Sequence, residues 1–172
     1  MQHVLIGFCA LLASSAAIAA EDAFRTGPVF EEFGPVADVD VTMDLPEGFA
    51  AKHSFDVSKR ADDGGMNRTL ISAARFINMH ARADVPMENL GVAVVVHGQA
   101  VKDVSGSDDG DNANAALIEA LTGAGVRIIV CGQSAAYYDV ATEDLLPGVE
   151  MAISAMTAHA LLQQEGFTLN PF

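Results

Sequence analysis

The sequence has few basic residues, few aromatic residues and almost no cysteine. It contains nine Lys and Arg against 23 Asp and Glu in 172 residues, a formal net charge of −14. Phosphate groups need clustered Lys and Arg, so this balance argues against nucleic acid and anionic lipid as partners. There is no Trp, and aromatic residues make up 6% of the chain. Because 51% of the residues are nonetheless hydrophobic, the chain can bury a core of ordinary size for one domain.

Long hydrophobic runs are absent except at the N-terminus. Residues 4–20 are almost wholly apolar or small, and Glu21 is the first charged residue. The run is short for a membrane span, and residues 17–19, Ala-Ile-Ala, have the small-x-small pattern of a signal-peptidase site. Residues 1–3 carry no Lys or Arg, so an uncleaved membrane anchor stays open as an alternative. We expect residues 1–20 to be a cleaved signal peptide, the mature protein to be periplasmic, and no membrane contact after cleavage.

Cleavage of the signal peptide would change the number of cysteines in the chain. Cys9 lies inside the apolar run and is lost on cleavage, which leaves Cys131 as the one cysteine of the mature chain. Cysteines of oxidising compartments are usually paired, so a lone one deserves an explanation. It is either a buried, inert side chain or a reactive thiol.

The sequence offers no convincing metal site. The histidines outside the central motifs, His53, His80 and His159, are scattered and have no metal-ligand spacing. The acidic stretch 103–112 fits a calcium loop poorly, because Asp108 stands where the turn glycine belongs. We therefore interpret 103–112 as a solvated loop, and we expect neither a metal nor a cofactor.

The mature chain divides into an N-terminal arm, residues 21–49, and an α/β domain, residues 50–172. The arm is rich in Gly-Pro turn signals and includes a candidate edge strand at 39–43. Apolar periodicity then predicts, in order, strand 53–57, helix 66–82, strand 91–96, helix 112–122, strand 127–130, helix 134–146, strand 149–153, helix 154–165 and strand 167–172. Arginines recur every seven residues on one helix and are interpreted as a solvated face: Arg68, Arg75 and Arg82.

This alternation predicts the fold class. Strands that are β-branched and apolar throughout suit a sheet covered on both faces. Strands joined through helices are normally parallel, with right-handed crossovers. We predict a three-layer α/β/α domain with a mainly parallel sheet of about five strands.

Two stretches of the chain are close copies of each other. Residues 92–100 read VAVVVHGQA, and residues 126–134 read VRIIVCGQS. We call the pattern that these two stretches share the frame. In each, an apolar run is followed by one reactive side chain, His97 or Cys131, and then by Gly-Gln. Ligands of open α/β sheets bind beyond the carboxyl ends of the strands, so we expect the imidazole and the thiol to lie at one edge of the sheet.

The residue types at that edge indicate thiol chemistry. A nearby imidazolium and the N-terminus of the helix that follows would both favour the thiolate of Cys131. The glycines would turn the chain and leave N–H groups open, while the glutamines would add amide hydrogen bonds. No Asp or Glu stands where the sequence would predict a hydrolytic triad. The candidate catalytic residues are Cys131 and His97, and the candidate ligand-binding residues are Gly98, Gln99, Gly132 and Gln133. The alternative is that both frames simply end buried strands.

Residues 53–172 resemble the DsrE/DsrF-like family, which includes the YchN-like and TusD-like proteins. The resemblance rests on AARFIN at 73–78, VHG at 96–98, GVRIIVCGQ at 125–133 and LLPGV at 145–149. It is strongest to an exported branch of that family. It implies an α/β/α fold and assembly into rings such as trimers or hexamers. In the sulfur-relay members it implies a persulfide on a cysteine after a central strand, a position that Cys131 matches.

We therefore expect a periplasmic sulfur-handling protein in which Cys131 carries a persulfide or acts as a thiol nucleophile. Whether it is a sulfurtransferase or a sulfur carrier is left open. The expected partners are other copies of the chain, as a trimer or hexamer, and a sulfur donor or acceptor protein. The alternative is a non-catalytic small-ligand-binding or assembly module of the same fold, with Cys131 as part of the wall.

Overall fold

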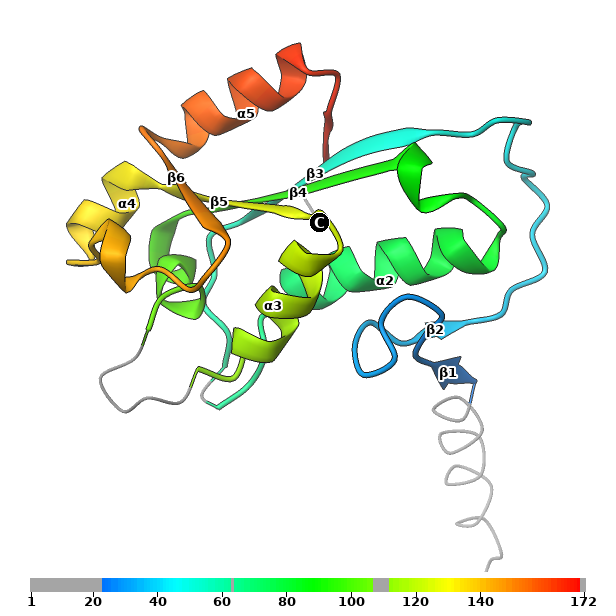
Figure 1. Ribbon diagram of the computed structural model, residues 1–172, viewed down its shortest axis with the longest axis horizontal. Coiled ribbons are helices and arrows are strands. Elements are labelled where there is room, and N and C mark those ends of the chain that lie inside the picture. The colour runs from blue at the N-terminus through cyan, green and yellow to red at the C-terminus, as the bar shows by residue number, and fades with distance from the viewer. Residues whose placement is uncertain (1–22, 63, 107–111, 171–172) are drawn as a thin grey trace, which may run out of the picture.

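The centre of the molecule is a sheet of five parallel strands. The computed structural model describes residues 23–62, 64–106 and 112–170 (Figure 1). The strand order is β6-β5-β4-β3-β7, which confirms the predicted parallel sheet. The strands are β3 Ala51–Val57, β4 Leu90–Val96, β5 Arg127–Cys131, β6 Val149–Ala152 and β7 Thr168–Asn170. The predicted signal peptide lies outside the described residues.

Helices cover both faces of the sheet, as a three-layer fold requires. In Figure 1, α2 (Arg68–Arg82) and α3 (Ala115–Gly123) lie on one side, and α5 (Ala155–Gln164) lies on the other. The larger core packs between the sheet and the first pair of helices, and a smaller one packs under α5. Successive residues of β4 enter the two cores alternately, because side chains of a strand point to opposite faces. This central strand is therefore apolar at every position from Val92 to Val96.

The helix starts follow ordinary capping chemistry. Asn67 caps α2, and its side chain accepts a hydrogen bond from the N–H of Thr69 at 3.0 Å. Ser154 caps α5 and accepts from the N–H of Thr157 at 3.1 Å. The cap at Ser154 matters for function, since it fixes the N-terminus of α5 at the carboxyl edge of the sheet. Within the described ranges, no helix is long and apolar enough to cross a membrane.

One predicted helix is wrong in extent, and one predicted strand is absent from the described residues. The helix predicted at 134–146 is only α4, Gly132–Tyr137, followed by a 3₁₀ turn, η3, at Thr142–Asp144. Asp139 has a φ of +56°, a left-handed conformation that ends the helix. Residues 39–43 form no strand. The short strands of the arm are instead β1 Phe24–Arg25 and β2 Val36–Ala37, which pair with each other.

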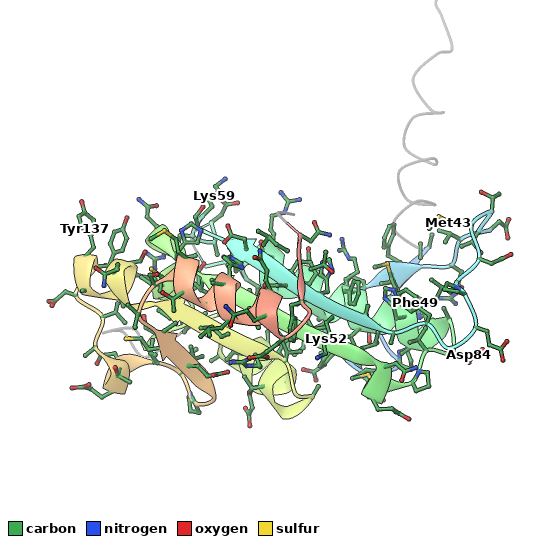
Figure 2. The ribbon with its side chains drawn as sticks, turned by 90° about the horizontal axis from the view of Figure 1, so that it is seen from above. Met43, Phe49, Lys52, Lys59, Asp84 and Tyr137 are labelled. Carbon is green, nitrogen blue, oxygen red and sulfur yellow. The ribbon has the colours of Figure 1, made fainter. Side chains whose placement is uncertain are left out.

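The arginine face of α2 binds the N-terminal arm, so the prediction of a solvated face is wrong for two of its three members. Arg82 donates to the backbone carbonyls of Arg25 at 2.9 Å and of Gly27 at 3.1 Å. Arg75 donates to the carbonyl of Pro35 at 3.0 Å. Arg68, the first residue of the helix, is exposed as predicted. These bonds tie the arm to the domain on the side of α2, and Figure 2 shows the arm around Met43 at the far end of the molecule from Tyr137 on α4.

Candidate functional site

Three neighbouring strands each bring a reactive side chain to the carboxyl edge of the sheet. Val57, Val96 and Val130 stand in register across β3, β4 and β5. His97 and Cys131 come next on their strands, so the two copied frames end side by side. Asp56 lies one row below, in register with Val95.

Side chains alternate between the two faces of a strand, and this alternation places Asp56, His97 and Cys131 on the face that α5 covers. Val95 and Ile129 belong to the core under α5, and residues two positions further along a strand point the same way. His97 and Cys131 stand at those positions. Asp56 pairs with Val95 and shares its face, which explains how it reaches His159 of α5.

The groups meet at a cavity of about 320 Å³. Its wall combines the ends of the strands with the first turns of α5 and one residue of α4. The residues that line it are Asp56, His97, Cys131, Gln133, Ser154, Ala155, Met156 and His159. The structure therefore brings together the two candidate catalytic residues and one of the four candidate ligand-binding residues, Gln133.

Cys131 is held by hydrogen-bond donors from two helices. It is the N-cap residue of α4 and is only 6% exposed. Burial raises the pKa of its thiol, but hydrogen bonds outweigh that effect and lower the pKa. The donors are the Ser134 hydroxyl and the backbone N–H groups of Ser134, Ala155 and Gln133. These N–H groups lie in the first turns of α4 and α5, where helices leave donors unpaired, so the arrangement favours the thiolate.

His97 makes its contact with a carboxylate. Its Nε2 lies 3.1 Å from Oδ2 of Asp56. The other carboxylate oxygen, Oδ1, lies 2.8 Å from Nε2 of His159. Partial burial raises the pKa of Asp56, but the hydrogen bonds from His159 and then His97 outweigh it and lower the pKa. The site thus holds an ionised carboxylate shared by two imidazoles, beside the thiol.

Asp56 and His159 are functional candidates that the sequence interpretation missed. The sequence placed no Asp or Glu for a hydrolytic triad and showed no metal-ligand spacing around His159, so neither residue was assigned to the site. A signal for Asp56 was present, because it lies near the end of the predicted strand 53–57 and the same sheet-edge argument applies to it. His159 had a weaker signal, its place one turn inside a helix that begins at that edge.

The frame glycines are explained by close backbone approach. A Cβ on Gly132 would lie 2.7 Å from the carbonyl oxygen of Ala152. Gly98 has a φ of +53°, and a Cβ there would lie 2.9 Å from the carbonyl oxygen of Ser58. The N–H of Gly98 donates to Oγ of Ser134 at 3.0 Å, so it is not open to a ligand as expected.

The two glutamines differ in position. Gln133 lines the cavity, and its Nε2 donates to the carbonyl of Ile153 at 3.3 Å. Gln99 is exposed and is not among the residues that line the cavity. The structure therefore places Gln133 where a ligand could meet it, and it does not place Gln99 there.

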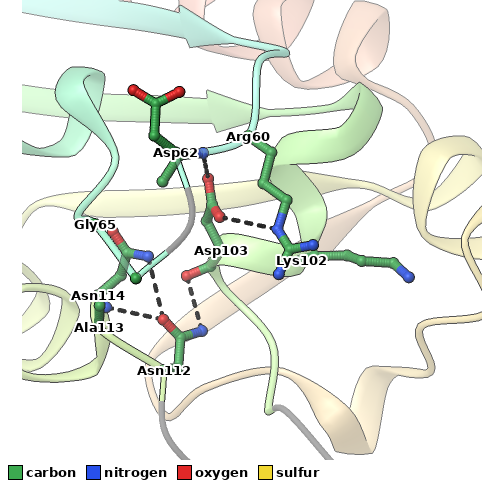
Figure 3. Close-up of a pocket in the computed structure, with 10 residues that line it drawn as sticks. Arg60, Asp62, Gly65, Lys102, Asp103, Asn112, Ala113 and Asn114 are labelled. Atoms are coloured by element: carbon green, nitrogen blue, oxygen red, sulfur yellow. Dashed lines mark hydrogen bonds and ion pairs between the residues drawn. The ribbon is translucent and has the colours of Figure 1, made fainter.

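A second pocket, of about 110 Å³, is built from polar groups that satisfy one another (Figure 3). The buried carboxylate of Asp103 accepts from the N–H of Ala61 at 2.8 Å and from Nδ2 of Asn67 at 2.7 Å, with Arg60 at 3.7 Å. Asn112 donates to the carbonyl of Asp103 at 3.0 Å. The stretch 103–112 is thus not solvated at its start, and its residues 107–111 lie outside the described ranges. This network joins the segment after β3 to η2, the 3₁₀ helix Gly98–Asp103, so it serves the fold.

Metal binding has no geometric support in the residues that the structure describes. No group of three or more His, Cys, Asp or Glu side chains there is arranged to hold a metal ion. At the cavity, the imidazoles of His97 and His159 are instead hydrogen-bonded to the carboxylate of Asp56.

Fold and cavity together define an α/β/α protein with a cysteine at the carboxyl end of a parallel strand. Residues 53–171 match the model of the DsrE/DsrF-like family, and the chain belongs to that family, as the motifs predicted. Family membership suggests a sulfur-related role.

The solved structure of MTH1491 has a similar fold. The protein of unknown function MTH1491 from Methanobacterium thermoautotrophicum is 22% identical, covers 72% of this chain and 99% of its own, and has a TM-score of 0.54. The ychN protein from E. coli is 17% identical, covers 70% and 99%, and has a TM-score of 0.44. The likeness to MTH1491 bears on the fold alone. No curated protein matches the sequence significantly.

Proposed function

We propose that this protein handles sulfane sulfur and that Sγ of Cys131 is the atom that accepts it. The carrying observation is the position of Cys131, which is the N-cap residue of α4 and lines the cavity together with the first turn of α5. There the N–H groups of both helices and the hydroxyl of Ser134 lower the pKa of the thiol. Such donors stabilise a thiolate, which is the nucleophilic form of cysteine. The same donors would stabilise the anion of a persulfide in the same place.

In the proposed step, the Cys131 thiolate attacks the outer sulfur of a persulfide donor, R–S–SH. An S–S bond forms on Cys131 while the S–S bond of the donor breaks, and the products are Cys131–S–SH and the thiol R–SH once the leaving thiolate takes a proton. The sulfur must then pass to another molecule, because the chain has no second cysteine beyond residue 20. A donor or acceptor protein is the proposed partner.

Intact-mass spectrometry with a persulfide donor tests this function. The wild type should gain about 32 Da per chain, one sulfur atom, and reductant should remove it. Cys131→Ser should gain nothing and keep its fold by circular dichroism, because Ser is close to Cys in size. If the wild type gains no mass where a small control thiol does, the function is refuted.

The competing function is a binding or assembly module in which Cys131 is part of the wall. The burial of Cys131, only 6% exposed, is the observation in its favour. This function predicts that the thiol reacts only when the protein unfolds. The mass measurement therefore also separates the two functions.

We further propose export to the periplasm with cleavage near Ala20 or Glu21. The apolar run 4–20 before the first charge supports it. Intact mass of the protein from its native compartment checks the proposal. A mass that retains residues 1–19 would contradict it.

We also propose a homo-oligomer of three or six chains. Large apolar side chains stand exposed at the end of α4 and around the start of α5, and a partner chain would cover them: Tyr137, Ile153 and Met156. Light scattering at micromolar concentration should give a trimer or hexamer, and a monomer would overturn the proposal.

A further inference from the structure

The polar groups of the cavity fall into two separate sets. Within the described residues, the groups that lower the pKa of Cys131 are N–H groups and the Ser134 hydroxyl, and no imidazole is among them. Both imidazoles instead bind the carboxylate of Asp56 through Nε2. The thiolate thus has its own stabilisers, and the imidazoles must be explained by something other than the charge on Cys131.

The two imidazoles also differ from each other. The side chain of His97 is 32% exposed, whereas that of His159 is 14% exposed. Nδ1 of His159 is buried and has no hydrogen-bond partner among the described residues. A ligand in the cavity can therefore reach the ring of His97 more readily than that of His159. The contact that His159 makes is with the carboxylate of Asp56.

We infer that Asp56 and His159 hold His97 in place as the proton donor to the sulfur that leaves the donor molecule. This inference rests on the proposed function. A carboxylate bonded to one ring nitrogen fixes the orientation of an imidazole and leaves the second nitrogen for the substrate. The bond from His159 at 2.8 Å fixes the carboxylate in turn. Asp56 and His159 are positioning residues.

The step balances without any further reagent. The Cys131 thiolate attacks R–S–SH, the S–S bond of the donor breaks, and the leaving R–S⁻ takes the proton of the His97 imidazolium. The products are Cys131–S–SH, R–SH and neutral His97. The sulfane sulfur moves from one thiol to another, so no oxidant or reductant is consumed.

A proton donor matters only when the leaving thiolate is basic, and this gives a specific test. Two reactions of Cys131 are compared: sulfur transfer from glutathione persulfide, with a basic alkyl thiolate leaving, and exchange with an aromatic disulfide, with a weakly basic aryl thiolate leaving. His97→Ala should slow the first on the order of 100-fold, as loss of a general acid does. It should change the second by less than about threefold, because a weak base leaves without a proton.

Variants of the positioning residues refine the test. Asp56→Asn should slow persulfide transfer on the order of tenfold, because one amide oxygen cannot accept from both imidazoles. His159→Gln keeps an N–H for Asp56 and should restore most of the rate that His159→Leu loses. His80→Gln is the matched control, since His80 lies on the last turn of α2 away from the cavity. It should leave both reactions unchanged.

The outcomes separate this inference from the proposed function. If the wild type gains no sulfur, the proposed function fails. If the wild type gains sulfur but His97→Ala slows both reactions equally, His97 is structural and the inference is overturned. Equal rates of persulfide transfer for His159→Gln and His159→Leu would show that His159 does not position Asp56.

Discussion

Residues 92–100 and 126–134 share one sequence frame but end in different local structures. In the first copy, His97 is followed by Gly98 at a φ of +53° and by the 3₁₀ helix η2. In the second, Cys131 is the N-cap of α4, and Gly132 is already helical. N–H groups of the second copy therefore lower the pKa of its own thiol, while the imidazole of the first copy binds Asp56 on β3.

The last position of the frame adds a further difference. It is Ala100, which is buried, in the first copy and Ser134 in the second. Oγ of Ser134 accepts from the N–H of Gly98, and the same hydroxyl lowers the pKa of Cys131, so Ser134 links the two copies. The two copies thus place two reactive groups side by side. Their chemistry is decided by the positions at which the copies differ and by residues outside them, such as Asp56 and Ala155.

Moving the thiol to the first copy should break the comparison most strongly. In the double variant His97→Cys, Cys131→Ser, the thiol lacks the converging N–H groups. Its alkylation at pH 6 should be at least on the order of tenfold slower than that of wild-type Cys131, because fewer thiols are ionised. Iodoacetamide labelling followed by mass spectrometry measures this. Equal rates would mean that the local structure after β5 does not activate the thiol.

The two frame glycines should both resist substitution, for different reasons. Gly132→Ala drives a Cβ against a carbonyl of β6, and Gly98→Ala adds left-handed strain to a contact with Ser58. Each should lower the free energy of unfolding in urea by about 1–3 kcal/mol. Gly123→Ala, at the end of α3 with nothing within 4 Å of its Cβ, is the control and should be neutral or stabilising. A neutral Gly132→Ala would contradict the close approach of β6.

The shared carboxylate should make stability depend on pH. The pKa of Asp56 is lowered in the folded state, so its ionised form stabilises the fold above the ordinary aspartate pKa of about 4. This contribution is lost as the pH falls through the lower folded value. Asp56→Asn should cost about 1–2 kcal/mol at pH 7, and the difference from wild type should shrink below about pH 4. Urea unfolding at pH 7, 5 and 3 checks it, and a difference independent of pH would contradict it.

The smallest expected effect comes from the residue that links the two copies. Ser134→Ala removes a hydroxyl donor from Sγ of Cys131 while the N–H donors stay, so the pKa of the thiol should rise. Titration of the thiolate absorbance near 240 nm, roughly where thiolates absorb, measures the shift against wild type. A lower or unchanged pKa would show that the hydroxyl does not donate to the sulfur.

The sheet was predictable because its signals are local. Apolar runs such as Val92–Val96 reveal buried strands, and helices between them require parallel pairing. The end of α4 was not predictable from periodicity, because the left-handed turn at Asp139 interrupts an otherwise helical pattern. The arm was misjudged because its strands pair with each other, and its contacts with α2 come from arginines that looked solvated.

The site was predictable only in part. The repeated frame placed His97 and Cys131 at one edge, because register within a parallel sheet follows from strand order. The partners of His97 are distant in sequence: Asp56 is 41 residues away, and His159 is 103 residues from Asp56. Such contacts depend on how α5 crosses the sheet, which no pattern within a single segment encodes.

The central claim is that Cys131 is a nucleophile in the folded protein, and the pH dependence of its native alkylation tests that most directly. The rate should follow ionisation of a single thiol with an apparent pKa below the value of about 8.5 for a free cysteine. The helix donors and the Ser134 hydroxyl are the reason, since they lower the pKa of Cys131. Labelling that is slow at every pH and appears only when urea unfolds the chain would contradict the claim and assign Cys131 to the wall of a binding module.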